Sequence, residues 1–247
     1  MNLQDFFAKH PDVAVAFSGG VDSAYLLYAA KRYAQRVRAY YVKSEFQPRF
    51  ELEDAKRLAQ ELNVDMRVLD LSVLQVPCVA DNPADRCYHC KRAIFTQIIE
   101  AAAEDGFTVL LDGTNASDDS ADRPGMRALR ELSVLSPLRD CGLTKSEVRR
   151  LSGEAGLFTW DKAAYACLAT RIPTGEVITP EKLEKTEAAE NYLSSLGFED
   201  FRVRMREGQA VLQLKEEQWP LIVRQRQAVL AELKKYYKSI VIDMEVR

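Results

Sequence analysis

Short apolar runs alternate along the first two thirds of the chain with segments whose apolar residues recur at helical spacing. The run at 13–17 stops at a serine–glycine turn, and helical spacing follows over 24–33. In chain order, we expect further strands at 37–42, 65–71 and 108–111 and further helices at 51–62, 91–103 and 145–155. Repeated strand–helix units predict a Rossmann-like α/β fold, with helices on both faces of a parallel sheet.

The pattern changes after residue 171. A turn and a long helix come first, then a hairpin whose two strands alternate apolar and polar residues, and then another helix and a last strand. We place these elements, in chain order, at 172–175, 180–196, 201–205 with 210–214, 216–236 and 239–244. The chain is therefore expected to form two domains: an α/β domain over 1–172 and a small α+β domain for substrate binding or oligomerisation over 173–247.

Composition and charge narrow the class of protein. The 247 residues are 47% hydrophobic, which is enough for a core of ordinary size. A net charge of −3 gives no overall positive field to attract nucleic acid or an anionic membrane. The N-terminus is too polar for a signal peptide, and no apolar run approaches the roughly 20 residues that span a bilayer. We expect a cytoplasmic protein that acts on a small molecule.

The turn Ser18-Gly19-Gly20-Val21-Asp22-Ser23 carries the first candidate chemistry. Backbone amides and the positive end of a helix dipole would face one anion there. Ser18 and Ser23 can donate to phosphate oxygens, and Asp22 beside a polyphosphate makes sense with Mg²⁺ between the like charges. An ordinary strand–helix turn is the alternative, and neither the Walker pattern nor G-x-G-x-x-G fits.

The five cysteines favour thiol or metal chemistry over a disulfide framework, because the chain shows no export signal. Cys87 and Cys90 form a C-x-x-C at an expected helix start, where the dipole favours thiolates. Half of a structural zinc site is the alternative, although four ligands are needed and no second C-x-x-C or suitable histidine pair exists. We expect Cys78 and Cys141 to be small buried residues, and Trp160 to lie in the core.

Further polar groups follow the ends of the predicted strands. Ligands of open α/β sheets collect at the carboxyl edge. Asp112-Gly113-Thr114-Asn115 directly follows an apolar strand, and Cys167, Thr170 and Arg171 are also expected at this edge. Besides the turn at 18–23, the residues expected to bind the nucleotide are Ser44, Gly113, Thr114 and Arg123.

The hexapeptide SGGVDS matches the PP-loop of the ATP pyrophosphatases. With RCYHCK, DGTN followed by DDSADRPG, LSPL and ACLATRIP, the chain resembles the LarE family of sulfur transferases over nearly its whole length. The resemblance implies that ATP adenylates a carboxylate of pyridinium-3,5-biscarboxylic acid mononucleotide, which becomes a thiocarboxylate on the route to the nickel-pincer nucleotide. Adenylation needs positioning and charge neutralisation, so Asp22 and Arg171 are the expected catalytic residues beside Cys167. Homo-oligomers are also implied.

The resemblance further implies a source of sulfur. One branch of the family sacrifices a single cysteine, whereas another binds a 4Fe-4S cluster through three cysteines and leaves one iron open. Here Cys87, Cys90 and Cys167 would supply the three thiolates, and Ala166 stands where the sacrificial cysteine falls. An open iron can present hydrosulfide to an acyl adenylate. Sacrifice of Cys167 is the alternative.

On the substrate side, Arg202 and Arg204 project from one face of a predicted strand. Paired guanidinium groups suit a phosphate, and the resemblance carries substrate-phosphate binding onto them, although a plain solvent-facing strand would look the same. Glu190 aligns with a functional acid of the family or is a surface helix residue. Thr170 completes the expected substrate set.

Three other functions stay open. A tRNA thiolase would usually add a basic RNA-binding domain or zinc ribbons, which this sequence lacks. In an amide-forming PP-loop synthetase, ammonia would attack the adenylate and the three cysteines would have no purpose. A nucleotide-binding regulatory module would bind ATP or AMP without turnover.

Overall fold

The computed structural model describes residues 1–118 and 124–245. Their contacts divide the chain into two compact units: residues 1–79 with 85–162, and residues 80–84 with 163–247. This division differs from the expected boundary at residue 172. The short helix η2 (Leu168–Arg171) belongs to the second unit because Leu168 is buried and Arg171 pairs with Glu190 there.

The first unit contains a parallel sheet in the strand order β3-β2-β1-β4. The strands are β1 (Asp12–Ala16), β2 (Arg36–Lys43), β3 (Met66–Asp70) and β4 (Leu110–Leu111), and all neighbours are parallel. The predicted Rossmann-like sheet is confirmed. The chain runs from β1 out to β3 and then returns to the other side of β1, so the strand order reverses between β1 and β4. Such a switch point is where ligands of open sheets bind.

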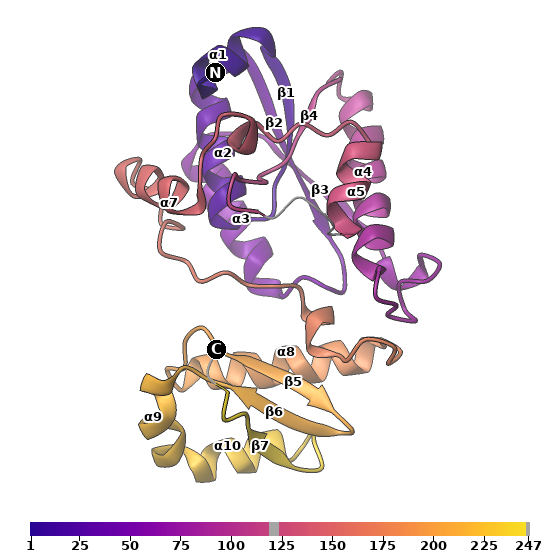
Figure 1. The fold of residues 1–247 in the computed structure, drawn as a ribbon, viewed down its shortest axis with the longest axis vertical. Coiled ribbons are helices and arrows are strands. Elements are labelled where there is room, and N and C mark those ends of the chain that lie inside the picture. Colours follow the sequence, from indigo (N-terminus) through magenta and orange to yellow (C-terminus); the bar gives the residue numbers. More distant parts are fainter. Residues whose placement is uncertain (119–123, 246–247) are drawn as a thin grey trace. The chain divides into compact units, whose positions relative to one another are not determined.

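Helices cover both faces of this sheet (Figure 1). The four predicted helices are present as α2 (Val21–Tyr33), α3 (Arg49–Glu61), α4 (Arg86–Glu104) and α7 (Lys145–Glu154). The start of α4 lies earlier than predicted, which places Cys87 in its first turn and Cys90 at the beginning of its second. The sequence pattern did not reveal the short helices α1 (Leu3–Lys9), α5 (Pro124–Glu131) and α6 (Pro137–Asp140).

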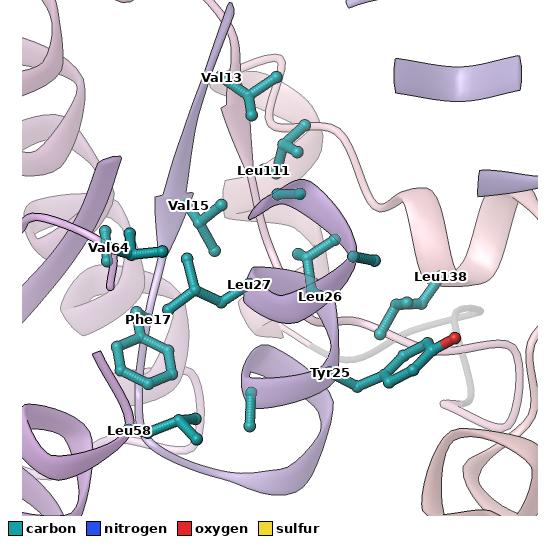
Figure 2. Packing of buried hydrophobic residues seen from close by; sticks show 14 of the residues in the cluster. Val13, Val15, Phe17, Tyr25, Leu26, Leu27, Leu58, Val64, Leu111 and Leu138 are labelled. Carbon is teal, nitrogen blue, oxygen red and sulfur yellow. The ribbon is translucent and has the colours of Figure 1, made fainter. Parts of the chain in front are cut away.

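Two apolar clusters hold the layers together. One packs α1, α2, α3 and α7 against the sheet, and Figure 2 shows Leu27 of α2 beside Val15 of β1, with Phe17 next to Leu58 of α3. The other packs α4 and α5 against the opposite face. The turn that follows β1 is therefore anchored by a strand and a helix that are both deeply buried.

The second unit has a three-stranded sheet in the order β5-β6-β7. The predicted hairpin is confirmed as the antiparallel pair β5 (Arg202–Arg206) and β6 (Gln209–Gln213), while β7 (Ile240–Ile242) lies parallel to β6. The long helix α8 (Pro180–Ser195) precedes them. No helix within 1–118 or 124–245 is long and apolar enough to traverse a bilayer.

The single helix predicted over 216–236 is wrong. The segment forms η3 (Glu216–Gln218), α9 (Trp219–Arg224) and α10 (Arg226–Leu233). Pro220 lies at the start of α9, where its missing N–H is tolerated, and Gln225 has φ −90° and ψ 6°, which interrupts the regular helix.

Two predictions about buried side chains are also wrong. Cys78 is exposed and has φ +69°, because it lies in a turn rather than in a buried segment. Trp160 is 49% exposed and lies outside the core, beside Gly153 of α7. Cys141 is only half-buried, but it packs against the first apolar cluster, and burial raises the pKa of its thiol.

Candidate active site

The turn after β1 folds back on itself through its two serines. The Ser23 hydroxyl donates to the Gly20 carbonyl at 3.1 Å and lies 3.1 Å from the Ser18 hydroxyl. Gly19 has φ +74°, and a Cβ there would lie 3.1 Å from the Glu51 carbonyl oxygen, so the position requires glycine. Gly20, the N-cap of α2, has no side chain that could accept from the first turn, so the N–H groups that begin at Val21 can face an anion.

The loop after β4 lies directly against this turn. A Cβ on Gly113 would lie 2.7 Å from the backbone nitrogen of Ser23, so glycine permits the close approach. Asp112 is buried and accepts hydrogen bonds from Thr114 Oγ1 and, at 2.5 Å, from Ser136 Oγ. These bonds hold the loop at the edge where the strand order reverses.

Asp22 lies between a cation and an amide. Its Oδ2 accepts from Lys145 Nζ at 2.5 Å, and its Oδ1 accepts from Asn115 Nδ2 at 3.3 Å. Sequence reasoning did not find Lys145, which stood out only as the first residue of a predicted helix. A carboxylate beside the N–H groups at the start of a helix is a suitable Mg²⁺ ligand once a polyphosphate is present.

Ser44 and Arg123 were also expected to bind the nucleotide. Ser44 follows β2 and donates to Gln47 Oε1 at 2.5 Å, so its hydroxyl has a partner within its own loop. Arg123 lies outside the described residues, and its role stays a prediction.

The cysteine pair lies at the start of α4, as predicted. Cys87 is exposed, Cys90 is half-buried, and a guanidinium nitrogen of Arg86 lies 3.9 Å from the Cys87 sulfur. Cys167 is half-buried at the start of η2 in the second unit. Soft sulfur donors suit iron, so the residue types fit a cluster. Within 1–118 and 124–245, however, no three His, Cys, Asp or Glu residues are gathered as a metal site requires.

Arg171 and Glu190 form a buried ion pair in the second unit. The guanidinium donates to both carboxylate oxygens, at 2.8 Å from Nε and 3.0 Å from Nη2, and only 1% of Arg171 is exposed. Tyr165 Oη and the Val203 N–H also donate to Glu190, at 2.5 and 2.9 Å. The alternative of a surface helix residue is therefore wrong for Glu190. Burial lowers the pKa of Arg171, but the hydrogen bond and the charge of Glu190 raise it overall.

The paired arginines of β5 share one face of the strand, as predicted, because Val203 and Met205 between them are buried. Arg204 donates to Gln213 Oε1 at 2.6 Å and to the Thr170 carbonyl at 3.0 Å. Arg171, Arg204 and Arg206 line a cavity of about 180 Å³ that also includes Asp243. Of the predicted pair, Arg204 thus faces a hollow rather than a flat surface, whereas Arg202 is not among the residues that line this cavity.

Comparison with known proteins identifies the family. A profile described as queuosine biosynthesis protein QueC matches residues 12–79, from β1 to just beyond β3. The chain is 34% identical to the pyridinium-3,5-bisthiocarboxylic acid mononucleotide synthase of Lactiplantibacillus plantarum, over 83% of this chain and 75% of that protein. The chain belongs to the LarE family. It is an ATP-dependent sulfurtransferase of the PP-loop class.

Two other relatives differ in how much of this LarE-family chain they match. An uncharacterized protein of Synechocystis sp. is 36% identical over 88% of the chain and 81% of its own length. The tRNA-specific 2-thiouridylase MnmA of Thermotoga maritima is 26% identical over 68% of the chain and 63% of its own length. The tRNA-modifying relative is thus more distant than the mononucleotide synthase.

Proposed function

We propose that this LarE-family chain adenylates a carboxylate of pyridinium-3,5-biscarboxylic acid mononucleotide and converts it to a thiocarboxylate. The observation that carries the proposal is the uncapped first turn of α2 beside Asp22, in a chain related to a synthase of the bisthiocarboxylic acid. That turn offers N–H donors and a carboxylate together, which suits a polyphosphate with Mg²⁺.

The proposed chemistry has two displacements. A carboxylate oxygen of the substrate attacks the α-phosphorus of ATP, and the bond to the β-phosphate breaks to release pyrophosphate. Hydrosulfide then attacks the acyl carbon, AMP leaves, and the carboxylate has become a thiocarboxylate. Both steps move negative charge toward phosphate oxygens, so N–H donors and cations at the turn stabilise them.

The residues have separate roles in these steps. The N–H groups and hydroxyls of 18–23 hold the pyrophosphate, Asp22 holds Mg²⁺, and Ser44, Thr114 and Arg123 complete the nucleotide site. Arg202 and Arg204 bind the phosphate of the substrate, because paired guanidinium groups match phosphate oxygens. Arg171, Glu190 and Thr170 shape the substrate side.

Cys87, Cys90 and Cys167 are proposed to hold a 4Fe-4S cluster, which would supply an open iron for hydrosulfide. This requires the thiols of the two units to come together. In the alternative, Cys167 gives up its own sulfur and becomes dehydroalanine. We further propose that the enzyme works as a homo-oligomer in the cytoplasm, on a small nucleotide rather than on nucleic acid.

The sulfur source is tested by anaerobic purification followed by iron and acid-labile sulfide analysis. We expect the wild-type protein and a Cys78→Ala control to hold the cluster, and Cys87→Ala to lose it. A wild-type protein without iron whose Cys167 loses the mass of hydrogen sulfide during turnover would refute the cluster and support the sacrificial route.

The acceptor is tested by the release of pyrophosphate from ATP. We expect release to depend on the pyridinium biscarboxylate mononucleotide and to be abolished by Asp22→Asn. Release that instead requires a tRNA transcript would overturn the proposed substrate.

A further inference from the structure

The outer edge of β7 lacks the features that usually protect the edge of a sheet. In the part of the chain that the structure describes, β7 pairs with β6 alone, so the other side of the strand is open. Natural edge strands are commonly kept from pairing by a proline, a charge or a bulge. The segment Ile240-Val241-Ile242 has neither proline nor charge, its register with β6 is regular, and its β-branched side chains favour strand pairing.

The backbone of β7 turns the hydrogen-bonding groups of two residues toward this open edge. The Asp243 N–H donates to a carbonyl of β6 at 2.9 Å, and the Ser239 carbonyl accepts from an N–H of β6 at 2.9 Å. Peptide groups alternate between the two sides of a strand, so those of Ile240 and Ile242 point away from β6. A further strand could therefore bond to β7 at these two residues.

The side chains beside this edge are apolar and exposed. Val241 and Ile242 are 38% and 42% exposed, and Val223 of α9 is 73% exposed. A groove of about 160 Å³ is lined chiefly by apolar side chains of β7, α9 and α10, among them Ile242, Val223 and Leu230. Apolar surface of this kind beside an open strand is typical of an interaction site.

Charges on either side of β7 favour a second copy of this chain as the occupant. Lys234, Lys235 and Lys238 precede the strand, whereas Asp243 and Glu245 follow it. An antiparallel copy places its acidic end beside the basic end of the first strand, and the reverse, so opposite charges meet at both ends. A parallel copy would bring like charges together. The segment is therefore complementary to itself only in the antiparallel direction.

We propose that β7 pairs antiparallel with β7 of a second copy, around a two-fold axis at Val241. In this register Ile240 of each copy lies opposite Ile242 of the other, and their outward N–H and carbonyl groups bond to one another. The two Val241 side chains meet on the axis. The apolar grooves of the two copies then face each other on the same side of the joined sheet. The inference deepens the homo-oligomer of the proposed function by naming its interface.

Charged substitutions on the proposed axis test this arrangement in the purified full chain. Two like charges would meet at position 241, so we expect Val241→Lys and Val241→Glu each to lower the assembly mass by about half in analytical ultracentrifugation at a fixed concentration. An equimolar mixture of the two variants should regain the wild-type mass, because lysine of one copy then meets glutamate of the other. Val177→Lys is the matched control: Val177 is an exposed valine of the same unit outside β7, and its substitution should leave the mass unchanged.

Hydrogen exchange shows whether the strand edge itself forms the contact. We expect the Ile240 and Ile242 amides to be protected in the assembled wild type and to exchange about tenfold faster in Val241→Lys. The Asp243 amide bonds to β6 with or without a partner, so its continued protection shows that β7 stays folded in the variant. Dilution of the wild type gives the same comparison without a substitution.

Three results would overturn the proposal. A monomeric wild type would leave this edge uncovered or open to a strand of a different protein. An assembly whose mass neither substitution at Val241 changes, or a mixture that does not regain the mass, would exclude the two-fold axis. Ile240 and Ile242 amides that exchange freely in the assembled wild type would place the contact elsewhere. None of these measurements uses ATP or the pyridinium substrate, so a failure of sulfur transfer in an intact assembly counts against the proposed function instead.

Discussion

Arg171 was expected from the sequence to be catalytic, and in the structure it forms a buried ion pair with Glu190. Every guanidinium nitrogen of Arg171 donates within the second unit, including Nη1 to the Ala166 carbonyl at 2.7 Å. Sequence alone suggested a catalytic residue, because the arginine follows Cys167 in a motif-rich segment. Its burial could not be predicted, since it depends on a helix that comes later in the chain.

Removal of Arg171 should destabilise the protein more than the loss of an exposed pair would. We expect Arg171→Met to lower the free energy of unfolding by about 3–5 kcal/mol, because it leaves the Glu190 carboxylate buried without its counterion. Arg150→Met is the control: its pair with Glu154 is 59% exposed on both sides and should contribute less than about 0.5 kcal/mol. Urea unfolding measures both, and equal effects would contradict the prediction.

Tyr40 predicts a dependence of stability on alkaline pH. Burial, and then the hydrogen bond to Asp105 at 2.8 Å, raise the pKa of this phenol from 10.0 to about 12. Below pH 10 the phenol is protonated in the folded and unfolded states, so its stabilisation is fully present. It is lost as the pH rises toward about 12.

We therefore expect the free energy of unfolding to fall less steeply between pH 10 and 12 in Tyr40→Phe than in the wild type. Urea titrations at a series of pH values measure the slope. Tyr237, whose pKa is also raised to about 12 by burial, contributes to both proteins. Identical slopes would show that Tyr40 ionises alike in both states.

At the scale of elements, periodicity predicted most of what the structure contains. The buried strands and the long helices of the first unit keep a strong pattern, so their existence and order were correct. The break at Gln225 was missed because apolar spacing continues through it, and α1 was missed although Asn2 and Asp5 form a capping box.

The SGGVDS and DGTN loops were predicted to meet because parallel strands end at one edge. The partner of Asp22 was not predicted, since Lys145 reaches it only when α7 packs on α2.

The close contact between the loops after β1 and β4 can be tested with glycine variants. Gly113→Ala would place a Cβ 2.7 Å from the Ser23 nitrogen and force the loops apart. We expect the rate of pyrophosphate release to fall by about 10²-fold, because misplacing catalytic groups by about 1 Å has effects of that size.

Gly153→Ala is the control within α7. The atoms nearest to a Cβ there belong to the Trp160 ring, at 3.7 Å, an ordinary contact, and alanine favours the helix by about 0.5–1 kcal/mol. This variant should be slightly more stable and fully active. If Gly113→Ala behaves in the same way, the close approach of the loops has no importance for activity.

At the scale of the whole molecule, the division into units could not be predicted from a linear pattern. Residues 80–84 lie between two parts of the first unit but belong to the second. Asn82 is 1% exposed, and its Nδ2 donates to the carbonyls of Ile172 and Pro173 at 3.3 and 2.7 Å. The Gly175 N–H donates to the Asn82 carbonyl at 2.8 Å. The spacing of apolar residues along the sequence does not reveal that segments so far apart in the chain pack together.

Asn82→Ala should therefore weaken the second unit although the residue lies early in the sequence. We expect a loss of about 1–3 kcal/mol, because buried carbonyls lose their donor. Hydrogen exchange should quicken at Gly175 and at Ile178, whose N–H donates to the Ala80 carbonyl at 2.8 Å, while the amides of β1 stay protected. Asn63→Ala, another asparagine with positive φ but in the first unit, should not change exchange at Gly175 and Ile178. Uniform acceleration across both units would contradict this assignment.

The placement of residues 80–84 also bears on the order in which the protein matures on the ribosome. The first unit has all its residues once residue 162 has been synthesised, but this short stretch belongs to the second unit, whose other residues, 163–247, are made later. Nascent chains that have released residue 162 from the ribosome, but not the second unit, should hold a formed nucleotide turn while Asn82 still awaits its carbonyl acceptors. The second unit is therefore completed after the first during synthesis.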